Sequence, residues 1–153
     1  MSVLKATRSS QDLLCAEFIF NYNDTAVDSV AGTSKSFGST YTDAIVFDAI
    51  NLPTGAQIVG GDLVVETQGV GPTAYTLAIG VAGNTACYLA ATSLLTAAST
   101  RTALLLTSAL ASNAGANIRF TIASTVANAT AGKFRVTVLY KIDGRCGREV
   151  TPV

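Results

Sequence analysis

The chain lacks histidine and tryptophan altogether, and only three of its 153 residues are cysteine. Without histidine there is no Ser-His-Asp or Cys-His arrangement to activate a nucleophile, and no histidine-ligated zinc site. The three cysteines have no CxxC spacing and are too few to form a zinc site by themselves. These absences remove most classes of enzyme, so we expect a non-enzymatic protein without metal or cofactor.

Charge and long apolar runs are also scarce. Charged residues make up 13% of the chain, about half the usual share, and the formal net charge is zero. A neutral chain produces no global field that attracts nucleic acid or anionic lipid, and no apolar run reaches the roughly 18 residues that a membrane helix needs. Low charge with many β-branched residues is the opposite of the disordered signature. We therefore expect a folded protein with no direct nucleic-acid or membrane partner.

The expected absence of a secretory leader indicates synthesis in a cytoplasm, which bears on the state of the three cysteines. Acidic and amide side chains interrupt the first twenty residues, so no secretory leader is expected, and a reducing compartment follows. Cys15 lies on a strand pattern and Cys87 precedes Tyr88 and Leu89, so both are interpreted as small buried hydrophobic residues. Cys146 lies between Arg145 and Arg148, where nearby cations would lower a thiol pKa. An ordinary tail cysteine is favoured there over a reactive thiol.

Alternation of apolar and polar residues is the main signal in what the chain does contain. It predicts seven strands, around residues 16–22, 45–47, 57–67, 75–81, 104–106, 118–122 and 134–140. Ser34 to Ser39 adds a weaker eighth. Residues 87–98 form the only helix-compatible stretch, and their Thr and Ser content favours a short irregular helix or a long loop. The adjacent Gly60 and Gly61 predict a bulge or bend within their strand.

The connections decide the fold class. Strands separated by Gly, Pro, Asn and Thr turns, with no alternating helices, predict an all-β, antiparallel two-sheet sandwich, jelly-roll-like, of about eight strands. We expect one domain over residues 1–153, with a core at about residues 12–142. The arms 1–11 and 143–153 have little core pattern and would be ordered by a partner.

The charges are unevenly distributed along the chain. Residues 12–66 contain eight acidic residues and one basic residue, whereas residues 133–149 contain five basic and two acidic residues. The two regions either pair within the fold or form opposed faces that meet neighbouring copies or a large partner. Four basic residues lie on the terminal arms and are the candidate partner contacts: Lys5, Arg8, Arg145 and Arg148.

Three local patterns have a functional and a structural interpretation. Asn21 to Asp28 offers hard oxygens for calcium, but it lacks the glycine and terminal glutamate of a loop motif, so turn chemistry at a strand end is favoured. Gly69 to Pro72 lacks the lysine and helix of a phosphate loop and is interpreted as a loop tip. Glu17 and Glu66 would be paired carboxylates only if the fold brought them together, and outward-facing strand positions are the ordinary interpretation.

Four segments resemble the small jelly-roll head decoration, or cement, proteins of tailed bacteriophages. They are the turn and strand Leu52–Gly61, the strand Leu77–Asn84, the segment Tyr88–Thr92 and the closing strand Phe134–Tyr140. Together they extend over roughly residues 43–141. Asn23 to Tyr41 is longer than expected for the family at this point, which leaves open an extra arm.

The resemblance implies a virion protein on the outer surface of the capsid. Such a protein clamps adjacent major capsid protein subunits, commonly as a homotrimer or a dimer, of which we expect the trimer. Acidic and basic regions that meet head to tail would close such a ring. A glycan- or receptor-binding jelly roll of a virion tail or surface is the alternative, and another structural subunit, such as a tail-tube or head-completion protein, is a third.

Overall fold

The structure is a computed structural model that describes residues 13–106 and 117–142, and these residues form strands, turns and loops. The strands are β1 (Leu14–Asn21), β2 (Thr25–Val27), β3 (Ser34–Ser36), β4 (Ile45–Ile50), β5 (Ala56–Val70), β6 (Ala74–Val81), β7 (Asn84–Ser93), β8 (Arg101–Ala103), β9 (Ile118–Thr125) and β10 (Ala131–Ile142). Among the described residues, no helix is long and apolar enough to cross a membrane.

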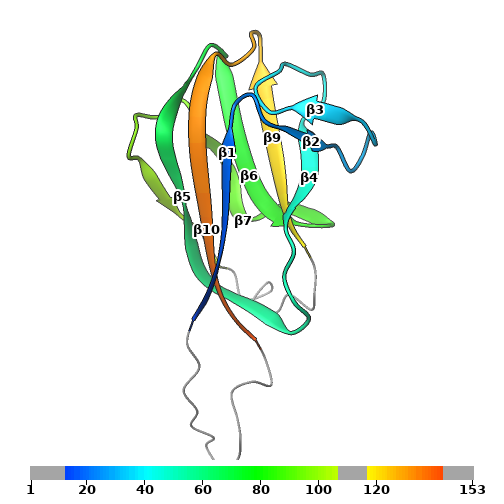
Figure 1. Ribbon diagram of the computed structural model, residues 1–153, viewed down its shortest axis with the longest axis vertical. Coiled ribbons are helices and arrows are strands. Elements are labelled where there is room, and N and C mark those ends of the chain that lie inside the picture. The colour runs from blue at the N-terminus through cyan, green and yellow to red at the C-terminus, as the bar shows by residue number, and fades with distance from the viewer. Residues whose placement is uncertain (1–12, 107–116, 143–153) are drawn as a thin grey trace, which may run out of the picture.

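Eight of these strands form two four-stranded antiparallel sheets that face each other (Figure 1). One sheet has the order β1-β10-β5-β8 and the other β4-β9-β6-β7, while β2 and β3 form a separate hairpin. When only the eight sandwich strands are counted, the two orders become 1-8-3-6 and 2-7-4-5, the arrangement of a jelly roll. The predicted all-β, antiparallel two-sheet sandwich is therefore confirmed, with the hairpin as an addition.

The core lies between the sheets and contains a cluster of phenylalanine rings. On β1 and β10, even-numbered side chains point inward, as the period of two requires. Phe20 lies 5.2 Å from Phe134 between ring centroids, and Phe18 meets Phe120 edge-on at 5.4 Å. Each fully buried ring contributes roughly 1.5–3 kcal/mol relative to exposure, so this cluster stabilises the contact between the sheets.

Two segments differ from the prediction. Residues 87–98 are predicted to form a short helix or a long loop. Their first seven residues belong instead to β7, which extends from Asn84 to Ser93 and pairs with β6. The apolar run Leu104–Leu106 is not a strand, since β8 ends at Ala103. Leu104 is buried in the core, whereas the two leucines after it are exposed. The run therefore places one apolar side chain in the core just beyond a very short strand.

The predicted irregularity at Gly60 and Gly61 is present. The β5–β10 register shifts between Leu139, which pairs with Gly60, and Tyr140, which pairs with Ile58. Gly61 has φ +146°, and a Cβ there would collide with the carbonyl oxygen of Thr137. Only glycine fits this close approach of two backbones, so the bulge fixes the register of the longest strand pair.

Candidate interaction surfaces

The β2–β3 hairpin is the part of the chain that the sandwich itself does not require. Its three residue pairs are Thr25–Ser36, Ala26–Lys35 and Val27–Ser34. The loop between the strands closes when Gly32 donates its N–H to the Asp28 carbonyl at 2.8 Å, with φ +68° at the glycine. Asn23 to Tyr41, which the sequence left open as an extra arm, therefore contains a folded hairpin beside β4 (Figure 1).

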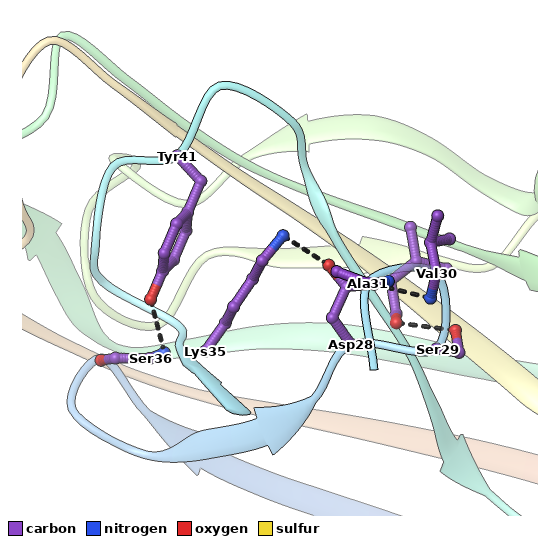
Figure 2. A network of polar contacts seen from close by, with 8 residues as sticks. Asp28, Ser29, Val30, Ala31, Lys35, Ser36 and Tyr41 are labelled. Atoms are coloured by element: carbon purple, nitrogen blue, oxygen red, sulfur yellow. Dashed lines mark hydrogen bonds and ion pairs between the residues drawn. The ribbon is translucent and has the colours of Figure 1, made fainter. Parts of the chain in front are cut away.

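A buried ion pair holds this hairpin together. Lys35 Nζ lies 2.6 Å from Asp28 Oδ2, and the two side chains are 14% and 2% exposed. Asp28 Oδ1 also accepts the backbone N–H of Val30 at 2.9 Å and of Ala31 at 3.4 Å, and Lys35 lies over the ring of Tyr41 (Figure 2). Burial by itself raises the pKa of Asp28, but the Lys35 and backbone hydrogen bonds outweigh it, so the pKa is below its ordinary value.

The hairpin presents apolar side chains on a fixed base. Ser29 donates both its N–H and its Oγ hydrogen to the carbonyl oxygen of Val46, at 2.7 and 2.8 Å, and so ties the loop to the outer edge of β4. Val30 is 80% exposed, and Val27 is also exposed. The hairpin loop is therefore held against β4 while these two valine side chains lie in solvent.

A groove of about 580 Å³ lies between β1, the hairpin and β4. Four phenylalanines line it (Phe18, Phe20, Phe37 and Phe47), and polar residues, among them Asp24 and Asp48, lie along it. Asp24 accepts the backbone N–H of Asn21 at 2.7 Å, and Asp48 pairs with Arg119 at 2.7 Å, which lowers the pKa of Asp48. Both carboxylates are thus already bound by donors of the same chain.

In the Asn21–Asp28 segment, the carboxylates accept hydrogen bonds that stabilise the turns and do not converge on a common cation site. Asp24 caps Asn21, while Asp28 accepts from Lys35 and from its own loop. Within residues 13–106 and 117–142, no group of three or more His, Cys, Asp or Glu side chains is placed to hold a metal ion.

The fold brings Glu17 and Glu66 to opposite sides of one arginine, which the sequence gave no reason to expect. β1 and β5 both pair with β10, and Arg135 on β10 lies 4.0 Å from Glu17 and 3.6 Å from Glu66. Lys133 adds a contact of 2.9 Å to Glu66. Both carboxylates form ion pairs with cations of the central strand, as outward-facing strand positions commonly do.

Most of the acidic residues that the structure describes therefore pair with basic residues of the same molecule. Besides the pairs on β10, Arg119 pairs with Asp48 and Arg101 with Asp62. Much of the acidic region is neutralised by bases of the same molecule. These exposed or half-exposed pairs are each worth about 0–1 kcal/mol, and they leave little charge to attract a neighbouring copy.

The β5–β6 and β9–β10 turns form one end of the sandwich. The start of β1 at Leu14 and the end of β10 at Ile142 lie at the opposite end (Figure 1). We call residues 69–74 and 124–131 the tip; neither segment contains a charged residue. Gly71, with φ +116°, packs so closely on the Asn128 carbonyl that a Cβ would collide with it. Thr130 donates its N–H to the Val70 carbonyl at 2.8 Å. The loop predicted at Gly69 to Pro72 is shorter than expected, because β5 extends to Val70 and only residues 71–73 connect it to β6.

Of the two cysteines that the structure describes, one is buried as predicted and the other is not. Cys87 is buried, as expected, and burial raises its thiol pKa. Cys15 is exposed, so its interpretation as a buried hydrophobic residue is wrong. It has an odd position on β1, whose even-numbered side chains face the core. Cys146 lies outside the described residues, as do the candidate partner contacts Lys5, Arg8, Arg145 and Arg148.

No protein-family model and no curated protein matches the sequence, but solved structures share its fold. A chain in the capsid asymmetric unit of cyanophage Pam1 is 21% identical, with a TM-score of 0.55 over 92% of this chain and 94% of that one. A chain in the acid-stable capsid of Helicobacter pylori bacteriophage KHP30 is 15% identical, with a TM-score of 0.57 over 87% and 90%. A chain in the capsid of Ralstonia phage GP4 is 15% identical, with a TM-score of 0.54 over 92% and 89%. The likeness extends over nearly the full length of each pair.

Proposed function

We propose that this protein is a non-enzymatic structural component of a bacteriophage virion. The observation that carries the proposal is the near full-length likeness of its jelly roll to chains in three phage capsid structures. In its finer form, the proposal places the protein on the outer surface of the capsid. There it acts as a decoration protein that cements the shell by bridging major capsid protein subunits.

The distribution of surface features supports a bridging role. A bridge needs two separate contact regions on one rigid body. The uncharged tip is one candidate region, at the end of the sandwich away from Leu14 and Ile142 (Figure 1). The basic residues of the arms, Lys5, Arg8, Arg145 and Arg148, are proposed as the other. On β6, β7 and β9, many outward or exposed positions are small Thr, Ser and Ala residues, which lose little side-chain entropy in a large flat contact.

Self-association is part of the proposal, as a homotrimer with a dimer as the alternative. Because the described charges pair within the molecule, contact area rather than attraction between acidic and basic regions must supply the association energy. Moderate salt then leaves the oligomer intact, since screening acts mainly on exposed charges. Light scattering coupled to size exclusion at low and high salt tests this: a monomer at micromolar concentration in both conditions contradicts it.

The decisive experiment uses phage particles with and without this protein. We expect the protein to copurify with filled heads in a fixed ratio to the major capsid protein. Heads that lack it should release DNA at a lower temperature, and adding the purified chain back should restore the release temperature. Absence of the chain from purified heads, or heads equally stable without it, would overturn the cementing function.

One observation favours the second candidate, a glycan- or receptor-binding module. The groove beside the hairpin combines the half-buried ring of Phe18 with polar residues such as Asn23 and Asp24, a mixed apolar and polar lining of the kind found in small-ligand sites. A glycan array with calcium present separates the candidates. Avid glycan binding that is lost when Phe18 is replaced by Ala would favour this second function over cementing.

A further inference from the structure

Val126 occupies a backbone conformation that disfavours valine. Its φ is +72°, and Ala127 donates its N–H to the Thr125 carbonyl at 2.9 Å, two residues back. This is a γ-turn of the rare kind with positive φ at its central residue. A β-branched residue is strained there, whereas glycine or asparagine fits readily.

Packing within the molecule does not explain the valine either. Its side chain is 81% exposed, so it contributes little to the core. Val70, the last residue of β5 and also part of the tip, is 50% exposed. The chain therefore maintains a strained residue and leaves its apolar side chain in solvent. Such a combination of local strain and exposed apolar surface is typical of binding sites.

The γ-turn is held rigidly by hydrogen bonds from the surrounding loops. The Thr125 carbonyl also accepts the N–H of Thr73 at 3.2 Å, and Ser124 Oγ donates to the Ala127 carbonyl at 3.2 Å. Thr40 donates its N–H to Asn128 Oδ1 at 2.8 Å, which ties in the β3–β4 loop. A side chain presented on a rigid base loses little entropy when it binds.

We propose that the tip is a shell-docking surface, in which Val126 and Val70 enter an uncharged apolar recess on the capsid subunits. This inference rests on the proposed virion function and deepens it by assigning a contact surface. The absence of charge from residues 69–74 and 124–131 selects an uncharged recess, because a charged partner surface would be desolvated without compensation.

The size of the tip selects the shell rather than a second copy as the occupant. A stable pair of proteins uses roughly 20–30 residues on each side, and two turns supply far fewer. So small a contact suffices when a second contact on the same lattice raises its effective concentration. The arms 1–11 and 143–153, with their candidate contacts Lys5, Arg8, Arg145 and Arg148, would provide that second contact.

The test compares two tip variants with a matched control. Val126→Gly and Val126→Asn both fit positive φ and remove the apolar side chain, and the asparagine variant does so without the added flexibility of glycine. Val30→Asn replaces an equally exposed valine on the hairpin. Each purified full-length variant is titrated onto heads that lack the protein, and sedimentation measures binding. Thermal unfolding and light scattering are measured on the same samples.

We expect both Val126 variants to unfold at the wild-type temperature or above it, because strain is relieved, while their affinity for heads falls about tenfold, the value of one buried valine. Val30→Asn should bind as wild type does. Unchanged binding by both Val126 variants, or equal loss in the Val30 control, overturns the docking surface. A changed oligomeric state with unchanged head binding also overturns it, in favour of a second copy. Failure of the wild-type protein to bind heads overturns the proposed function instead.

Discussion

The ion pair between Asp28 and Lys35 should be essential to the β2–β3 hairpin. Removing one partner of a buried pair leaves the other charge uncompensated, which costs about 3–5 kcal/mol. We expect the lower end of that range for Lys35→Met, because the Lys35 side chain retains 14% exposure and Asp28 keeps its two backbone donors. Asp28→Asn should lower the stability by a similar amount, since it leaves the Lys35 ammonium group without a counter-charge.

The double variant separates the pair from the rest of the hairpin. In Asp28→Asn with Lys35→Met no charge is stranded, so its loss of stability should be clearly smaller than the sum of the two single losses. Hydrogen exchange of residues 25–36 measures the local opening, and chemical denaturation measures the global free energy of unfolding. Additive losses, or single variants whose hairpin amides exchange as slowly as in the wild type, would refute the reasoning.

The same pair predicts a dependence on pH. The pKa of Asp28 is lower in the folded chain than its ordinary value, so folding favours the ionised carboxylate. Its contribution is present above the pKa of the unfolded chain, near 4, and is lost as the pH falls through the lower, folded value. The protection of the hairpin amides, relative to the intrinsic exchange rate at each pH, should therefore fall below about pH 4 in the wild type, and this fall should be absent from Asp28→Asn.

Three further predictions use other parts of the molecule. Gly61→Ala should lower the free energy of unfolding in denaturant titrations by about 3 kcal/mol or more, because its Cβ meets backbone, whereas Gly32→Ala, with open space around it, should cost only about 1 kcal/mol. Removing residues 144–153 should weaken attachment to heads without lowering the melting temperature; a large drop in melting temperature, or undiminished attachment, contradicts this. In that shortened chain, a thiol reagent should modify Cys15 rapidly and Cys87 only on unfolding, because only Cys15 is exposed; equal rates would be inconsistent with the burial of Cys87.

The alternating strands could be predicted from the sequence because each has one buried and one outward face. β9 and β10 follow the period of two along most of their length. β7 does not, because its pairing with β6 shifts register on both sides of Ile79 and its residues Cys87, Tyr88 and Leu89 are all buried. Where irregular pairing removes the alternation, the sequence pattern no longer distinguishes a strand from a helix or loop.

The interaction surfaces were harder to predict because they depend on contacts between distant segments. Glu17 and Glu66 meet at Arg135 only because β10 lies between β1 and β5. Val126 gives no turn signal, since positive φ is ordinarily marked by glycine or asparagine. Asp28 and Lys35 are close in sequence, but the short hairpin that buries their side chains shows no strong alternation, so only the weak strand at Ser34 to Ser39 pointed to it.

The position of β10 between β1 and β5 also has a consequence for how the chain folds. Leu14 pairs with Tyr140, so the earliest described strand finds its only sheet partner in the latest. Such a topology has a high contact order, and folding on a timescale of milliseconds to seconds is typical of it. During synthesis, β1 has no partner in its sheet, and β5 has only the three-residue strand β8, until residues 131–142 have left the ribosome. Polypeptides that terminate before β10 therefore lack a folded sandwich to offer to an assembling particle.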